Sequence, residues 1–171
     1  MFHPTYFQIP HAEARAMDPQ HRMFLEECAA AFQSAGYARA RLAGTRCGVY
    51  LGLANGDYLL LGDRAGSPRA SVTSSSNAIA AGRVSYFYDL AGPALTIDTA
   101  CSSSLVAVHL AVTALRSGEI DMAVAGGAAT YLSPDGLAQM ADAGMLSPTG
   151  ACHALSDDAD GFVPGEGAGA V

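Results

Sequence analysis

Residues 102–116 are the most constraining stretch of this sequence, because they have helical length and almost no polar face. Apolar side chains in this segment, among them Leu105, Val112 and Leu115, point in several directions around a helix of 3.6 residues per turn. A helix that is apolar on all sides is stable in water only where other elements cover it. We therefore expect this helix to be buried on nearly all sides within a layered fold.

Short β-rich runs alternate with helical patterns along the rest of the chain. The clearest helix begins with Asp18 as N-cap and Pro19 at the first helical position, and we expect it to end near Gly36. Strands are predicted at residues 47–53, 94–98 and 122–126, with another opening at 165–171, and helices at 77–90 and 134–143. This alternation predicts an α/β fold with a mostly parallel sheet, in one domain over residues 1–171.

Charge and composition argue against several kinds of partner. The chain carries a net charge of −7, and all nine of its basic residues are arginines scattered along the sequence, so we expect no nucleic-acid partner. Residues 1–17 lack the apolar stretch of a signal peptide, and the uncharged run 122–134 is too short to cross a bilayer. We expect a cytoplasmic protein without a membrane partner.

We expect no metal and no bound cofactor in this segment. The four cysteines form no Cys-x-x-Cys pair, and we expect most of them to be buried, reduced thiols. The acidic run at Asp157, Asp158 and Asp160 lacks the spacing of a calcium loop, which favours a solvated loop. Residues 165–169 lack the spacing of a nucleotide-binding loop, so we interpret their glycines as sites of close backbone packing.

Cys101 is the strongest candidate for a catalytic residue. If the strand ends near Asp98 and the helix begins near Cys101, the thiol lies at a helix N-terminus, where free N–H groups stabilise a thiolate and can hold an oxyanion. The small neighbours Ala100 and Ser102 leave room for an acyl chain. The residues alone leave a second interpretation open, in which Cys101 is a buried cysteine that opens a core helix.

No histidine in the chain is a convincing base for Cys101. His109 lies on the same predicted helix, about 12 Å along its axis, which is too far for a hydrogen bond. His153 falls in a predicted loop, and a surface side chain is the simpler interpretation. Deprotonation of the Cys101 thiol would therefore depend on the helix itself or on groups outside these residues.

The segment DTACSSSLVA at residues 98–107 closely resembles the nucleophile motif of β-ketoacyl synthase domains of modular type I polyketide synthases, members of the thiolase superfamily. Further segments agree with this family in the same order: MDPQHRMFLE (17–26), AGRVSY (81–86), LAGP (90–93), AGG (125–127), ADGFV (159–163) and GEG (165–167). The resemblance covers essentially the whole chain and identifies it as the N-terminal half of such a domain.

The resemblance implies a thiolase-like α/β/α fold and a two-stage reaction. Cys101 would accept an acyl group from an acyl carrier protein and then take part in a decarboxylative Claisen condensation, in polyketide or fatty-acid biosynthesis. It also implies that Asp160 and Phe162 lie beside the active site, although a loop-fixing carboxylate and a core aromatic explain them equally well. Phosphopantetheine would arrive on the carrier protein. Two histidines from later family motifs are absent here, so we expect the fragment alone to be inactive in condensation.

The family's first strand precedes Phe2, and we expect it to be central in the sheet, between the strands at 47–53 and 122–126. Without it, both neighbouring edges would be unpaired, so we expect the 171 residues alone to be unstable or to aggregate. The resemblance further implies a homodimer of the complete domain that pairs through the strand from Ala94 to Asp98. The arginines at 39, 41 and 46 are a weak candidate for docking an acidic carrier protein.

Two other functions remain open at this point. One is a non-elongating ketosynthase-like module that holds an acyl group and binds a carrier protein. The other is a cysteine thioesterase, or hydrolase, with its thiol at a strand–helix junction. The ordered set of ketosynthase-like segments argues against the hydrolase.

Overall fold

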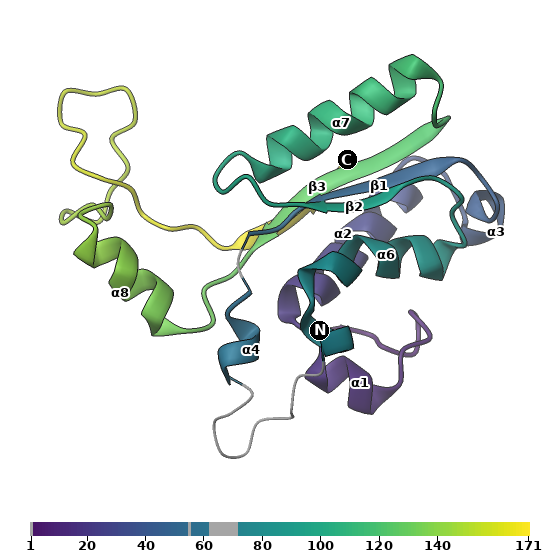
Figure 1. Ribbon diagram of the computed structural model, residues 1–171, viewed down its shortest axis with the longest axis horizontal. Coiled ribbons are helices and arrows are strands. Elements are labelled where there is room, and N and C mark those ends of the chain that lie inside the picture. Colours follow the sequence, from purple (N-terminus) through teal and green to yellow (C-terminus); the bar gives the residue numbers. More distant parts are fainter. Residues whose placement is uncertain (1, 55, 62–71) are drawn as a thin grey trace.

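The chain folds around a four-stranded sheet in the part that the computed structural model describes, residues 2–54, 56–61 and 72–171. The strands are β1 (Cys47–Gly52), β2 (Ala94–Ile97), β3 (Met122–Ala129) and β4 (Gly167–Ala170), in the order β2-β1-β3-β4. β1 pairs in parallel with both β2 and β3, whereas β4 is antiparallel to β3 (Figure 1). The predicted α/β class and the mostly parallel sheet are therefore confirmed.

β1 and β3 are direct neighbours in this chain, so the expectation that their facing edges would be unpaired is wrong. Their register runs from Cys47 opposite Met122 to Gly52 opposite Gly127, without a gap. Each strand therefore satisfies the backbone groups that the absent strand was expected to leave unpaired. Instability of the 171 residues alone stays a prediction, but this pairing removes the reason on which it was based.

Two helices cover one face of the sheet and form the larger core. α2 (Pro19–Ser34) begins as predicted: the Gln20 N–H donates to the Asp18 carboxylate at 2.8 Å, and Pro19 fills the first turn. α6 (Asn77–Tyr88) lies beside it and ends at a left-handed Asp89. Large side chains of these helices and of β1 fill the space between them, including Phe24, Phe32, Val49, Leu51 and Val84.

α7 (Ser103–Ser117) covers the opposite face of the sheet (Figure 1), and its surroundings differ from the prediction. Its contact with the sheet is a stripe of small residues, Ala107, Ala111 and Ala114, each no more than 5% exposed. Among the larger side chains, Val108 and Leu110 pack against this stripe, whereas Leu105, Val112 and Leu115 are exposed, Leu105 to 74%. The expectation of burial on nearly all sides is therefore wrong, because an apolar pattern does not say which side another element covers.

Within the described residues, one segment is long and apolar enough to cross a membrane by length and composition. It spans Ala100–Ser117, has a mean hydropathy of 1.2 over 18 residues, and is 22% buried. The segment that meets the length and composition of a membrane span is therefore this one and not the uncharged run 122–134, which the sequence analysis considered. In the structure, α7 packs lengthwise on β1 and β3, and its alanine stripe is part of a core with Tyr50, Ile120 and Ala125.

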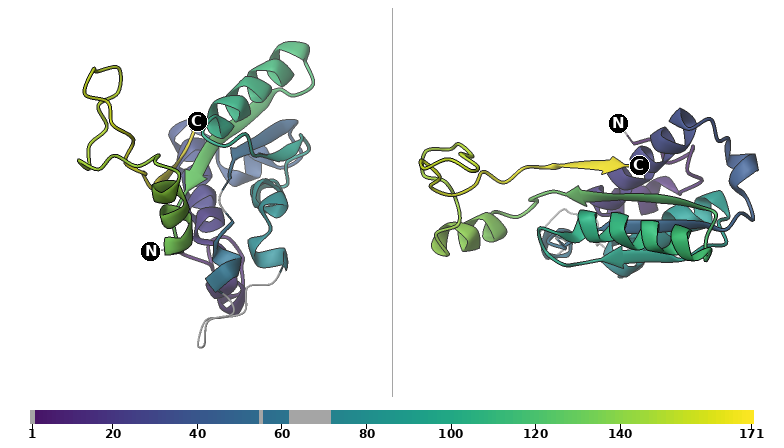
Figure 2. Two further views of the ribbon diagram at one scale, coloured as in Figure 1. Left: turned by 60° about the vertical axis from the view of Figure 1, so that its left-hand side comes forward. Right: turned by 90° about the horizontal axis from the view of Figure 1, so that it is seen from above.

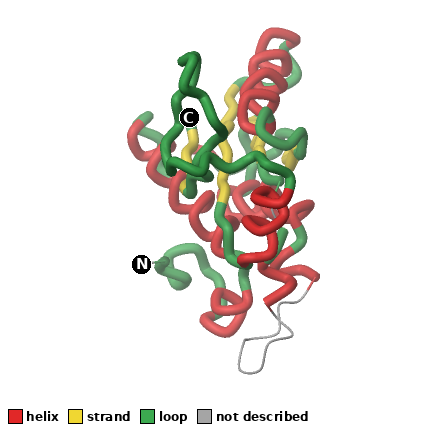
Figure 3. The backbone as a smooth tube through the Cα atoms, turned by 90° about the vertical axis from the view of Figure 1, so that its left-hand side faces the viewer, coloured by secondary structure: helices red, strands yellow, loops and turns green. Residues whose placement is uncertain are grey.

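The remaining helices are short and lie around this body. They are α1 (His11–Ala16), α3 (Arg39–Leu42), α4 (Tyr58–Leu61), α5 (Val72–Ser75) and α8 (Pro134–Asp142). α8, which is capped by the Ser133 hydroxyl, and the long loop after it extend away from the sheet before the chain returns as β4 (Figure 2). Figure 3 views the molecule from the side of this extension. The predicted helix at 134–143 and the predicted strand opening at 165–171 correspond to these elements.

His21 is buried in α2 without a hydrogen-bond partner for either ring nitrogen among the described residues. It is 1% exposed, and burial, followed by the charge of Arg83, lowers its pKa from 6.5 to about 4. Between those values the unfolded chain binds a proton that the folded chain does not. Stability is therefore fully present above pH 6.5 and is lost as the pH falls toward 4.

We predict that the free energy of unfolding falls by about 2 kcal/mol between pH 7 and pH 5 through His21 alone. Burial raises the pKa of Asp18 from 3.8, and that shift acts in the opposite direction, because above pH 3.8 the folded chain holds a proton at Asp18 that the unfolded chain has released. Urea unfolding at the two pH values measures the change, and His21→Phe should remove most of it. His109→Gln, at an exposed position, is the control and should keep the slope; equal slopes for His21→Phe and the wild type would contradict the assignment.

Candidate active site

Cys101 lies in the turn that joins β2 to α7, and its side chain is exposed. α7 begins at Ser103 with Ser102 as N-cap, so Cys101 precedes the first helical residue by two positions. Cys152 is also exposed, whereas Cys28 and Cys47 are buried, so the prediction of mostly buried thiols holds for two of the four cysteines. The interpretation of Cys101 as a buried core cysteine is contradicted by its exposure.

The turn before Cys101 has an unusual backbone conformation. Ala100 has a φ of 56°, in the left-handed region that a residue with a Cβ rarely adopts. The Asp98 carboxylate accepts a hydrogen bond from the Ala100 N–H at 3.0 Å, and the Ser103 N–H and hydroxyl donate to the Ala100 carbonyl at 3.1 and 2.7 Å. The Ser103 hydroxyl also accepts from the Thr99 N–H at 2.9 Å. These bonds hold the turn in its strained form.

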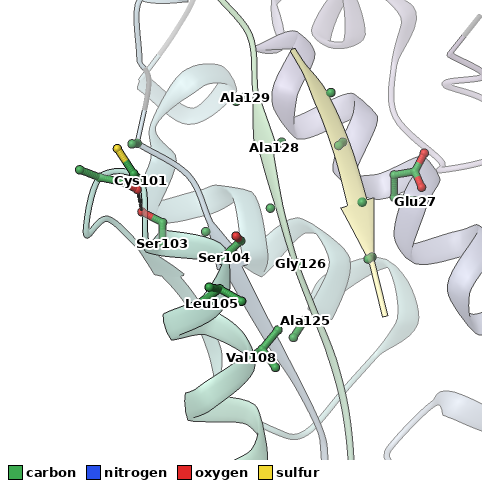
Figure 4. Close-up of a pocket in the computed structure, with 18 of the residues that line it drawn as sticks. Glu27, Cys101, Ser103, Ser104, Leu105, Val108, Ala125, Gly126, Ala128 and Ala129 are labelled. Atoms are coloured by element: carbon green, nitrogen blue, oxygen red, sulfur yellow. Dashed lines mark hydrogen bonds between the residues drawn. The ribbon is translucent and has the colours of Figure 1, made fainter. Parts of the chain in front are cut away.

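A cavity of about 810 Å³ opens beside Cys101 (Figure 4). The start of α7 forms one side of it, and the small residues of β3 and β4 contribute most of the rest of its lining. Among the described lining residues, Glu27 of α2 is the only carboxylate. The lining also includes larger side chains, namely Leu105 and Val108 of α7 and, from farther along the chain, Tyr131, Met140, Met145 and Phe162. A mostly apolar cavity of this volume can hold an apolar chain attached to the Cys101 sulfur.

The structure brings together some of the residues that the sequence singled out. Ala100, Cys101 and Phe162 line the cavity, whereas Ser102 and Asp160 do not. The Ser102 hydroxyl donates back to the Thr99 carbonyl at 2.8 Å. None of the five histidines of the chain lines this cavity, which agrees with the absence of an evident base. Among the described residues, no group of three His, Cys, Asp or Glu side chains could hold a metal ion.

Asp160 and Phe162 belong to the long loop between α8 and β4. The Thr149 hydroxyl donates to the Asp160 carboxylate at 2.8 Å, and hydrogen bonds from Ser147 and Thr149 lower the pKa of this carboxyl below 3.8. Asp160 therefore makes the contacts of a loop-fixing residue. The Phe162 N–H donates to the Met145 carbonyl at 3.0 Å, which aligns the two segments that contribute Met145 and Phe162 to the cavity lining.

Glycine is required at Gly161 for two reasons. Its φ is 142°, and an added Cβ would lie 2.5 Å from the Ser147 nitrogen. The two segments of the loop can therefore approach each other closely at this point, next to Phe162.

Gly52, at the end of β1, lets the start of α7 approach the sheet. An added Cβ would lie 2.5 Å from the Ser104 nitrogen and 2.6 Å from the Ser103 carbonyl carbon. These are backbone atoms that a rotamer change cannot move. The position of the Cys101 turn relative to the sheet therefore depends on a residue that the sequence analysis did not single out.

Three comparisons with known proteins show which family this chain resembles. The sequence model of "Beta-ketoacyl synthase, N-terminal domain" matches residues 1–171. Over 99% of its length the chain is 54% identical to polyketide synthase PksL of Bacillus subtilis, and over 97% it is 46% identical to a mycocerosic acid synthase-like polyketide synthase of Mycolicibacterium smegmatis. It spans 4% and 8% of the lengths of these two relatives, respectively.

Solved structures show the same fold. A ketosynthase from module 6 of the bacillaene synthase of Bacillus subtilis matches with a TM-score of 0.90 and 51% identity, over 99% of this chain and 29% of that one. An oxazolomycin ketosynthase domain from Streptomyces albus matches with a TM-score of 0.91 and 43% identity, over 99% of this chain and 30% of the other. The predicted resemblance is confirmed by these matches.

We predict that Gly52→Ala displaces the start of α7 and destabilises the chain by about 1–3 kcal/mol, because the added methyl group meets backbone atoms. Amide hydrogen exchange at residues 103–105 should become faster, and urea unfolding should give the loss of stability. Gly82→Ala is the matched control: it lies inside α6 with nothing within 4 Å of an added Cβ, and it should be neutral or slightly stabilising. Equal effects of the two substitutions would contradict the close approach at Gly52.

Proposed function

The chain belongs to the β-ketoacyl synthase family, and from this premise we propose that it is the N-terminal part of a condensing acyltransferase of polyketide biosynthesis, with Cys101 as the acyl acceptor. One observation supports this role most directly: Cys101 is exposed and lines a mostly apolar cavity large enough for an acyl chain. The whole enzyme's substrates and partners are part of this proposal, because the chain spans 29% of the matched ketosynthase.

In the first stage of the proposed reaction, the Cys101 sulfur attacks the carbonyl carbon of a thioester. A carbon–sulfur bond to Cys101 forms, the bond to the carrier sulfur breaks, and the carrier leaves as a thiol with the proton that Cys101 gave up. N–H groups at the start of α7 that have no partner within the helix can stabilise the oxyanion of the intermediate. The acyl chain would then occupy the cavity between α7 and strands β3 and β4.

In the second stage, an extender unit held as a thioester loses carbon dioxide. The electron pair left on carbon attacks the acyl carbonyl, a carbon–carbon bond forms, and the Cys101 sulfur leaves. In the family this stage uses histidines from later motifs, and none of the histidines here lines the cavity. We therefore propose that the 171 residues alone accept an acyl group but do not condense it.

We propose an acyl carrier protein as the partner that delivers the acyl group on phosphopantetheine. The arginines considered for its docking are already engaged: Arg39 lies 4.3 Å from the centre of the Phe87 ring, Arg41 lies 5.4 Å from that of Tyr37, and Arg46 pairs with Asp121. A ring contact, unlike the ion pair of Arg46, does not neutralise the positive charge of an arginine. Arg39 and Arg41 are therefore the better candidates for contact with an acidic partner.

A homodimer that pairs through the strand from Ala94 to Asp98 is also part of this proposal. β2 is the outer strand on its side of the sheet and pairs only with β1 among the described residues. An outer strand has one row of backbone groups free for a second copy of the chain. The hydrolase alternative has less support, because the whole chain matches ketosynthases at 43–51% identity.

We predict that incubation of the chain with an acyl N-acetylcysteamine thioester adds one acyl group to Cys101, as measured by intact-protein and peptide mass spectrometry. Cys101→Ala should abolish this addition, and Cys152→Ala, which removes the other exposed thiol, should leave it unchanged. Undiminished acylation of Cys101→Ala would exclude the proposed role. Release of free acid at a steady rate without carbon–carbon bond formation in the longer protein would instead support the hydrolase.

A further inference from the structure

We propose that Ser103 is a positioning residue for Cys101: its hydroxyl holds the left-handed turn at Ala100 that presents the sulfur to the cavity. This inference rests on the proposed function of Cys101 and adds a residue on which the acyl-transfer step depends. The sequence gives little sign of it, because Ser102, Ser103 and Ser104 follow one another and look equivalent.

The contacts of Ser103 distinguish it from its neighbours. Its side chain is buried, at 6% exposure, while Ser102 and Ser104 are exposed. Its hydroxyl accepts from the Thr99 N–H at 2.9 Å and donates to the Ala100 carbonyl at 2.7 Å. One oxygen thus joins two successive backbone units just before Cys101, and Figure 4 shows Ser103 directly beneath the cysteine at the start of α7.

The turn needs such a contact because Ala100 is strained. A left-handed alanine is unfavourable, and the turn persists only where its surroundings hold it. The other side-chain bonds to the turn come from Asp98 and Ser102, which are exposed, so water competes for them. The buried Ser103 hydroxyl is shielded from this competition.

The turn at Ala100 is the part of the site that can change conformation when the Ser103 hydroxyl is removed. The start of α7 is held against β1 by the close approach at Gly52, so loss of the Ser103 hydroxyl cannot easily be absorbed there. With alanine at 103, the Thr99 N–H loses its acceptor, and the Ala100 carbonyl keeps only the hydrogen bond from the backbone N–H of residue 103. Ala100 is then free to return to an ordinary φ, which turns Cys101 away from its present position.

Ser103→Ala tests this proposal by separating the position of the sulfur from its accessibility. Acylation of Cys101 by an acyl N-acetylcysteamine thioester should slow by about tenfold, the factor that corresponds to the strain of one left-handed alanine. Alkylation of Cys101 by iodoacetamide, which needs an accessible thiolate but neither the cavity nor an oxyanion site, should slow by less than acylation does, with Cys152 in the same chain as internal reference. Ser117→Ala, at the far end of α7, is the matched control and should leave both rates unchanged.

Ala100→Gly in the Ser103→Ala background is the decisive variant. Glycine adopts a positive φ without the Cβ penalty, so the double variant should recover most of the lost acylation rate. Failure of this rescue would overturn the proposal and would indicate that the hydroxyl acts on the substrate instead. An unchanged acylation rate in Ser103→Ala would overturn it as well.

Hydrogen exchange provides a measurement that does not depend on acyl transfer. Ser103→Ala should speed exchange of the Thr99 amide, while the Ser117→Ala control should not. Unchanged exchange at Thr99 would overturn the positioning role even if Cys101 is acylated normally. If the wild-type chain is not acylated at Cys101 but Thr99 exchange responds as expected, the proposed function fails while the role of Ser103 in holding the turn stands.

Discussion

The left-handed turn at Ala100 is the feature on which the candidate site depends, because it places Cys101 between the end of β2 and the start of α7. Such a turn has an energetic cost for any residue with a Cβ, so the surrounding structure must hold it. Hydrogen bonds from the chain on both sides do so, with the buried Ser103 hydroxyl at their centre. A longer or more flexible connection would let the sulfur turn away from the cavity.

The fold supports this turn through small residues. α7 lies close to the sheet because Ala107, Ala111 and Ala114 form its contact face, and because Gly52 has no side chain where the helix begins. Small residues of β3 and β4 leave the cavity open beside the helix. The close contact between α7 and the sheet and the cavity beside the helix thus have the same cause, namely short side chains. Larger residues at these positions would displace the helix or fill the cavity.

The sequence was informative where local chemistry decides the structure. The N-cap Asp18 with Pro19 predicted the start of α2, and the strand–Cys–helix pattern predicted the setting of Cys101. The sequence misled us where distant contacts decide. Periodicity does not show which strands pair, so the direct β1–β3 pairing was missed, and the apolar pattern of α7 does not reveal that Leu105 faces outward. Met140 of α8 and Met145 of the loop after it reach the cavity from far along the chain, for which no local pattern exists.

A strained turn, a close helix–sheet contact and an apolar cavity together support the proposed acyl transfer at one sulfur. The most direct test of this role is a crystal structure of the chain after reaction with an acyl thioester. We predict a thioester on the Cys101 sulfur, the acyl chain in the cavity between α7 and strands β3 and β4, and a positive φ retained at Ala100. An unmodified Cys101, or an acyl chain that lies outside this cavity, would contradict it.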